Sequence, residues 1–296
     1  MRSNNPVFAR SEEFNRASTN AYGNQTYPGG GHGQQQGPYG DPSTWGTGAP
    51  GMPGSTDLQA DQGRMTVDSV VQKTAISLFI VVVAAALTWM FTGDVVTEGN
   101  QVNDDAIGKL YLALMVGSFG AFGLSMVNSF KRVISPALVI AFAALEGVAL
   151  GAFSKFIGMY VGDTGIVVQA VIGTFAAFAG TLAAYKILDI KVSQKFRTFV
   201  VAAMFGMVAL GLLEMVLGFF GNQIGFFGFG GLGLLFAVGG LVLGIFMLIL
   251  DFDFVENGVA AGLPERESWR AAFALTVSLV WIYTNLLRIL AIFQQD

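Results

Sequence analysis

Seven long apolar runs follow one another from about residue 65 to the end of the chain. Each holds roughly 20 residues with few charges, the length of helix that crosses the hydrocarbon core of a bilayer. A segment in lipid must satisfy its backbone hydrogen bonds internally, so each run is predicted to be an α-helix. The sequence therefore predicts an all-α integral membrane protein, with a bundle of seven transmembrane helices over residues 65–296. The predicted spans are Val70–Phe91, Leu110–Val127, Pro136–Ile157, Ile166–Ile187, Phe199–Phe220, Phe229–Leu250 and Trp269–Phe293.

The first 64 residues have a different composition. Gly, Gln, Pro, Ser and Tyr dominate residues 22–54, and aliphatic side chains are almost absent. Such a segment cannot bury enough apolar surface to offset the entropy cost of ordering. Residues 1–64 are therefore predicted to form a disordered tail, in which Asn4-Asn5-Pro6-Val7-Phe8 is a candidate docking element.

Lysine and arginine concentrate in alternate loops. They precede the first span and recur between spans two and three, four and five, and six and seven, whereas the other loops hold only Lys109 and Lys155 near their ends. Loops rich in Lys and Arg stay on the cytoplasmic side. We therefore expect the tail in the cytoplasm and the C-terminus outside.

Composition removes several functional classes. The chain has no cysteine, and its one histidine, His32, lies in the tail, so neither thiolate chemistry nor a histidine-based catalytic or zinc site is expected in the spans. The net charge of −4 argues against nucleic-acid binding. An aspartate-pair protease needs acids on two spans, but Asp251 and Asp253 share one. We expect a protein that is not an enzyme and has no resident cofactor.

Small residues recur at four-residue spacing within several spans. Lipid provides no hydrophobic drive for helices to associate, so close approach through small residues replaces it. The pattern predicts intramolecular packing of a compact bundle, with a homodimer interface as the alternative for any one stripe; the oligomeric state stays open. The stripes are Ala113/Gly117/Ala121/Ser125, Ala143/Gly147/Gly151, Ala176/Gly180/Ala184 and Gly240/Gly244.

Three ionisable residues lie well away from the ends of the apolar spans. Glu146 lies near the middle of the third span, Glu214 in the outer third of the fifth and Arg288 in the outer half of the seventh. Such groups are costly in lipid and usually face the bundle interior or water, so they are candidates for an ion pathway or pH sensing. The alternatives are a neutral, buried carboxyl at Glu146 and snorkelling side chains at Glu214 and Arg288.

The sixth span is predicted to end near Leu250, where acids follow at Asp251, Asp253 and Glu256. Carboxylate oxygens suit hard cations such as calcium, and neighbouring carboxylates make a proton-sensitive site. Asp251 and Asp253 are therefore candidates for pH sensing and for binding a metal ion. The alternative is a solvated, acidic helix end.

Several motifs resemble those of one family. The third span carries Gly147-x-x-Leu150-Gly151, the fourth Ala170-x-x-x-Thr174-x-x-x-Phe178, and Asp251 closes the sixth; the seventh ends with Asn285-Leu286-Leu287-Arg288-Ile289-Leu290. These elements resemble the bacterial Bax inhibitor-1 (transmembrane Bax inhibitor motif) family over residues 65–293. Asn5–Phe8 and Leu250–Gly258 look most like an actinobacterial branch.

The resemblance implies a central helix wrapped by the others and a pH-dependent calcium leak across the bacterial inner membrane. In the family an aspartate of the sixth helix pairs with one of the seventh; here Ser278 takes the second place, or Asn285 in a shifted register. We expect a proton-sensitive cation leak, with Asp251 as gate, Glu146 on the path and calcium as the transported ion. The alternative is a regulator that binds a membrane protease or other membrane partner through its cytoplasmic tail, or a scaffold without transport.

Overall fold

The computed structural model describes residues 63–95 and 103–294. The predicted tail up to residue 62, including Asn5–Phe8 and His32, lies outside the described residues. Seven helices are long and apolar enough to cross a membrane, which confirms the seven predicted spans and the all-α fold. They are α2 (Val67–Phe91), α3 (Asp104–Phe130), α4 (Pro136–Val161), α5 (Gly165–Ile187), α6 (Gln194–Phe219), α7 (Gly231–Ala260) and α8 (Glu267–Phe293).

Most helices begin or end a few residues beyond the predicted span, because polar residues extend them. Thr66 and Ser69 form a capping box at the start of α2, and the Asn103 side chain accepts from the amide of Ala106 at 3.2 Å at the start of α3. These caps satisfy first-turn amides that have no partner inside the helix. At the other end of α4, Gly162 adopts the left-handed conformation, with φ 78°, that closes many helices.

The largest difference is at α7, which continues to Ala260 instead of ending near Leu250. The prediction was wrong because the acids end the apolar pattern without breaking the helix. Asp251, Asp253 and Glu256 therefore lie inside α7, where neighbouring helices supply polar partners. The acidic end of α7 is only partly solvated, because Asp253 is buried whereas Glu256 is exposed.

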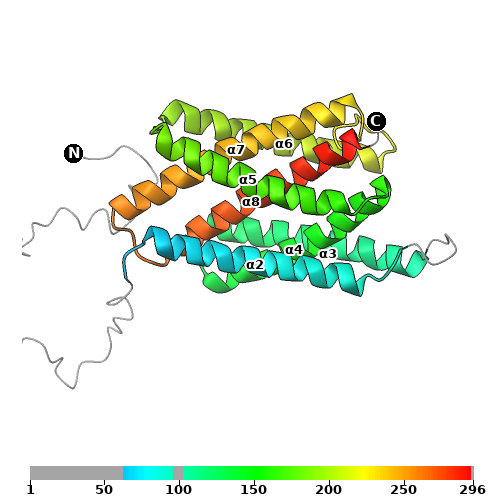
Figure 1. Cartoon of the computed structure of the whole chain (residues 1–296), viewed down its shortest axis with the longest axis horizontal. Coiled ribbons are helices and arrows are strands. Elements are labelled where there is room, and N and C mark those ends of the chain that lie inside the picture. The colour runs from blue at the N-terminus through cyan, green and yellow to red at the C-terminus, as the bar shows by residue number, and fades with distance from the viewer. Residues whose placement is uncertain (1–62, 96–102, 295–296) are drawn as a thin grey trace, which may run out of the picture. The chain divides into compact units, whose positions relative to one another are not determined.

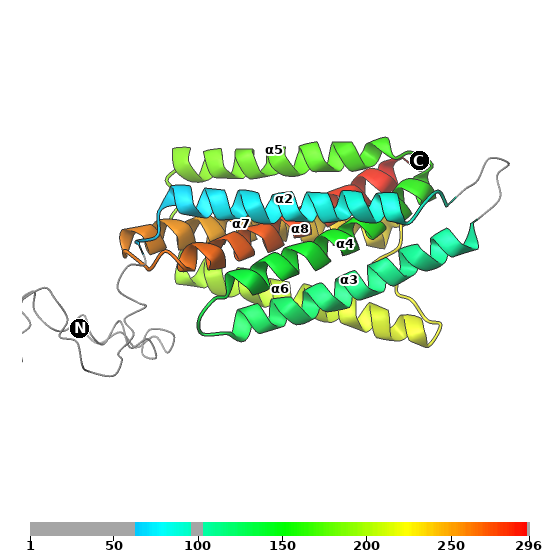
Figure 2. The ribbon, with the colours of Figure 1, turned by 90° about the horizontal axis from the view of Figure 1, so that it is seen from below.

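Helix α8 is the centre of the bundle. It packs against α2, α4, α5 and α7, while α3 packs on α4 and α6 packs on α7 (Figures 1 and 2). In its membrane-spanning stretch 67% of α8 is buried, compared with 17% for α3 and α6. A central helix wrapped by the others is what the resemblance implied.

Three of the predicted stripes hold helices at close range. A side chain at Gly147 or Gly151 would collide with the α2 backbone at Val81 or Ala85. Gly240 and Gly244 of α7 lie against side chains of α8, as Gly117 of α3 lies against the backbone of Ala149 in α4. These glycines serve packing within the chain.

Helix α5 packs through a different face from the predicted stripe. Ala176 and Gly180 are exposed, and an added Cβ at Gly180 would meet no atom within 4 Å. The packed face carries Ala170, which is fully buried, and Thr174, whose hydroxyl donates to the Ala170 carbonyl at 2.7 Å. Small residues at four-residue spacing occur on both faces of α5, so spacing alone selected the wrong face for Ala176, Gly180 and Ala184.

Candidate functional site

Three carboxylates near the end of α7 each bond to a different helix. The Ser278 hydroxyl of α8 donates to Asp251 Oδ2 at 2.5 Å, and Arg197 Nη2 of α6 donates to Asp253 Oδ2 at 2.8 Å. The hydroxyl of Tyr185 in α5 donates to Glu256 Oε2 at 2.7 Å. A helix turns about 100° per residue, so these spacings direct the acids to different sides of α7. We call Asp251, Asp253, Glu256 and these three partners the carboxylate end.

Asp251 differs from Asp253 in the charge of its partner. Ser278 is fully buried and neutral, so its bond orients the Asp251 carboxylate without neutralising it. Asp253 forms an ion pair with Arg197. Asp251 thus keeps its full charge, when ionised, at the contact between α7 and the central helix.

The contact with Ser278 also decides between the two registers considered for the missing second acid. Asn285 lies against Gly240 and donates to the carbonyl of Trp281 at 2.8 Å, well along α8 from Asp251. Ser278 therefore stands opposite Asp251, as the first alignment predicted.

The structure does not bring Asp251 and Asp253 together on one ligand, because their side chains face different helices. Across residues 63–95 and 103–294, no group of three or more His, Asp or Glu side chains gathers as a metal site.

The start of the described chain is tied to the same end of the bundle. The Met65 amide donates to the Leu263 carbonyl at 2.7 Å, and the Glu265 amide donates to the Gly63 carbonyl at 2.7 Å. Lys73 of α2 forms an ion pair with Glu265 at 3.0 Å. The segment that leads into α2 is thus fixed to the turn between α7 and α8.

Glu146 lies on the inner side of α4. Its neighbours one turn away, Phe142 and Leu150, belong to clusters that include Phe273 and Val280 of α8, so this face of α4 is directed at the central helix. Glu146 is partly buried, and the described structure records no hydrogen bond or ion pair for its carboxyl group. Close packing joins α4 to α2, α3 and α8, and α7 to α5, α6 and α8, so Glu146 and Asp251 lie on helices that flank α8.

Glu214 and Arg288 do not snorkel. Glu214 is only 5% exposed, and its carboxylate accepts from the amides of Ile224 at 3.0 Å and Gly225 at 2.8 Å. Arg288 is also buried and donates to the Phe226 carbonyl at 2.6 Å. Both side chains therefore hold the loop between α6 and α7, and their roles in an ion pathway stay predictions.

Lys155 has a comparable role that the sequence reasoning missed. Its buried ammonium donates to the Trp89 carbonyl at 2.9 Å, the Thr92 hydroxyl at 2.8 Å and the Gly93 carbonyl at 2.5 Å. It therefore caps the C-terminal end of α2, where carbonyls lack helical partners. Its position inside the predicted third span was a signal that it was not a loop residue. We call Lys155, Glu214 and Arg288 the capped end.

Arg197 and Tyr185 were missed as site residues for another reason. Both lie near helix ends, and Arg197 was considered only as a charge that sets orientation. One sequence does not reveal which helix ends meet in space, so no local signal pointed to their acidic partners.

Comparison with known proteins places this arrangement in a family. The family model described as Bax inhibitor 1 like matches residues 5–295. The match includes most of the tail, which the motif resemblance over residues 65–293 had left out. Comparison with curated proteins gave no match. On the strength of a match over nearly its whole length, the chain belongs to the Bax inhibitor 1 like family.

Proposed function

We propose that this protein is a proton-sensitive cation leak, without enzymatic activity, that calcium is its transported ion and that Asp251 is its gating acid. The supporting observation is the contact of Asp251 with Ser278. It places an acid with no charged partner between α7 and the central helix, while Asp253 beside it is neutralised by Arg197. Ionisable groups that face a bundle interior commonly mark ion pathways.

Protonation of Asp251 changes the charge of the proposed gate but not its hydrogen bond. A serine hydroxyl donates to a carboxylate and accepts from a carboxylic acid, so the contact of Ser278 with Asp251 persists in both states and only the charge changes. The ion pair of Asp253 with Arg197 joins α7 to α6 beside this contact. Lowering the pH neutralises Asp251, the proposed gate, and we expect cation flux to rise as the pH falls.

Glu146 is the second acid of the proposed path. Its support is its place on the face of α4 that is directed at α8, with no recorded partner. A carboxyl group without a partner is free to exchange protons or contact a passing cation. Glu146→Gln is expected to lower the flux at both pH values, whereas a gating residue changes their ratio.

The proposed setting is the bacterial inner membrane, with the N-terminus inside and the C-terminus outside. The Lys and Arg residues of the alternate loops support it, since they share the bundle end where α2 begins. Reporter fusions that fluoresce only in the cytoplasm test this orientation. Fluorescence from an N-terminal fusion and none from a C-terminal fusion is expected, and the reverse pattern would contradict it.

The direct test of the leak is calcium flux into proteoliposomes at pH 6 and pH 8. Asp251→Asn imitates the neutral acid permanently, so its flux at pH 8 should approach the wild-type flux at pH 6. Glu214→Gln is the matched control, because it also neutralises a buried carboxylate but away from the proposed gate. Flux no higher than in empty liposomes, or an unchanged pH ratio in Asp251→Asn, would overturn the proposal.

A second candidate function is regulation of a membrane-bound partner, such as a protease, through the cytoplasmic tail. It is favoured by the pairing of Gly63 and Met65 with the turn between α7 and α8, through which a partner bound to the tail would act on the carboxylate end. Deleting residues 1–60 leaves this pairing intact. The deletion should spare a leak and abolish co-purification of a partner if the tail is the binding element.

A further inference from the structure

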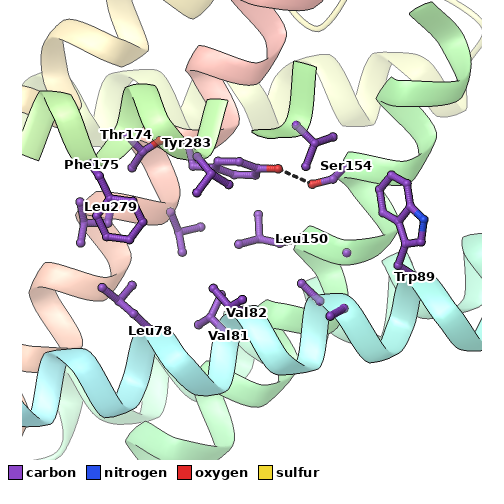
Figure 3. A pocket seen from close by; sticks show the side chains of 16 residues that line it. Leu78, Val81, Val82, Trp89, Leu150, Ser154, Thr174, Phe175, Leu279 and Tyr283 are labelled. Atoms are coloured by element: carbon purple, nitrogen blue, oxygen red, sulfur yellow. Dashed lines mark hydrogen bonds between the residues drawn. The ribbon is translucent and has the colours of Figure 1, made fainter. Parts of the chain in front are cut away.

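A cavity of about 290 Å³ lies between α2 and α5 (Figure 3). Leu78, Val82 and Trp89 of α2 line one side, and Val171 and Phe175 of α5 line the other. Residues of α4 and α8 form its floor. The volume is about twice the roughly 150 Å³ of an apolar cavity that binds benzene.

The hydroxyl groups on the cavity wall are already paired. The hydroxyls of Ser154 and Tyr283 bond to each other at 2.6 Å, and the Thr174 hydroxyl donates to a carbonyl of its own helix. An ion or polar solute in this cavity would lose hydration without gaining a partner. The chemistry of the wall therefore selects a hydrocarbon.

The cavity opens towards the lipid. Its floor residues Leu150, Leu279 and Val280 are buried, whereas Val82 and Phe175 on its two rims are 57% and 52% exposed. The close helix pairs place α2 on α4 and α8, and α5 on α8 and α7, so the rims belong to helices that do not pack tightly on each other. A flexible chain can therefore enter sideways between α2 and α5.

Along α2 the cavity is about as long as one leaflet of the bilayer is thick. Along α2 it runs from Leu78, near the middle of the helix, to Trp89, near its C-terminal end at Phe91. At 1.5 Å per residue this length is roughly 16 Å, about half of a hydrocarbon core of about 30 Å. Trp89 carries the Lys155 ammonium 5.7 Å from its ring centroid, and a Trp next to a cation is typical of the membrane interface.

We propose that this cavity, which forms a groove open to the lipid, binds one acyl chain of a membrane phospholipid. The lipid comes from the leaflet that the C-terminal end of α2 reaches. The apolar wall, the lateral opening and the length of one leaflet all fit this occupant. Inside a membrane no hydrophobic transfer drives binding, so the chain is retained because it supplies dispersion contacts that an empty groove lacks. Once bound, it joins α2 to α5, and the inference does not depend on the proposed leak.

The test uses the full chain in nanodiscs made with a phosphatidylcholine that carries a diazirine near the middle of one acyl chain. After irradiation, mass spectrometry locates the labelled peptides. We expect labelling at the groove, around Val82, Val171 and Phe175, to exceed that of the exposed face of α6 several-fold. Ala86→Phe fills the groove from its rim and should reduce the groove labelling to the level of α6.

The matched control is Ala209→Phe, which adds the same ring to an exposed position of α6 outside the groove. It should leave the groove labelling unchanged. The melting temperatures of both variants are first checked against that of the wild type. If Ala86→Phe melts at a lower temperature, Val171→Phe is used in its place. Equal labelling around the whole bundle, or equal responses of the rim and control variants, would show annular lipid only and overturn the proposal.

Discussion

The two membrane ends of the bundle both hold ionisable side chains, but these side chains bond to different partners. At the carboxylate end, Asp251, Asp253 and Glu256 contact side chains of three other helices. At the capped end, Glu214 and Arg288 contact backbone amides and a carbonyl. A backbone partner does not titrate and belongs to a fixed loop, so the capped end is built to be rigid. A side-chain partner on another helix makes a joint between two helices, and at Asp251 a proton changes the charge at this joint.

The largest expected effect lies at the capped end. Glu214→Ala leaves the amides of Ile224 and Gly225 without an acceptor, and an unpaired buried group costs about 1–3 kcal/mol. We expect the free energy of unfolding, measured by reversible detergent denaturation, to fall by about 3 kcal/mol. Glu214→Gln keeps one acceptor and should lose about half as much. If Glu214→Ala is as stable as the wild type but has an altered pH dependence of flux, Glu214 belongs to the proton-sensitive gate instead.

Arg288→Met tests the same loop from α8. The variant loses the bond to Phe226 and the stacking of the guanidinium, which lies 5.4 Å from the Phe227 ring centroid. We expect a loss of about 2 kcal/mol in the same unfolding assay. Arg288→Lys retains the charge without the planar group and should recover part of the loss. If Arg288→Met is as stable as the wild type, Arg288 does not help to hold the loop between α6 and α7.

Ser278→Ala probes the joint between α7 and α8. Removing the hydroxyl leaves Asp251 without its donor, and hydrogen bonds to charged groups contribute about 1.5–3 kcal/mol. The loss should be larger at pH 8 than at pH 5, because the hydroxyl bonds more strongly to the ionised carboxylate than to the neutral acid. Unfolding of both proteins at the two pH values measures this difference. A loss that is the same at both would mean that Asp251 does not change its protonation state in this range.

Arg197→Gln should have the smallest effect on stability, below about 1 kcal/mol, because the arginine side chain is 49% exposed and solvent screens the pair. Arg197→Gln should nevertheless change the cation flux measurably. Breaking the pair removes a joint between α6 and α7, so flux at pH 8 is expected to rise. Asp253→Asn is the matched partner variant, and the double variant should add little to either single change. If the effects of the two single changes add, the two residues do not act through their ion pair.

The sequence predicted the elements of this fold well but not the contacts between their ends. Uncharged runs identified all seven helices, and glycines such as Gly147 and Gly240 identified real packing faces, because both signals are local. The end of α7 was misplaced because hydropathy reports where lipid ends and not where a helix ends. The face of α5 was misjudged because spacing does not identify which neighbour a helix meets.

The candidate site was predicted in part. Asp251 and its contact with Ser278 followed from the family motifs, whereas Arg197 and Tyr185 required knowledge of which helices meet at the carboxylate end. Glu214 and Arg288 were recognised as unusual, but the sequence could not show that their partners are backbone atoms of one loop. Partners separated in the chain are determined by packing, which a single sequence does not encode locally.

The most direct test of the difference between the two ends is a pair of spin-label distances. The chain has no cysteine, so labels can be introduced at chosen positions alone. Exposed positions Lys195 and Val71 report the separation of α6 and α2 at the carboxylate end, and Phe219 and Met90 report it at the capped end. Between pH 8 and pH 5 in nanodiscs, we expect the distribution for Lys195 and Val71 to shift or broaden and that for Phe219 and Met90 to stay the same. An unchanged carboxylate end, or equal changes at both ends, would contradict the account.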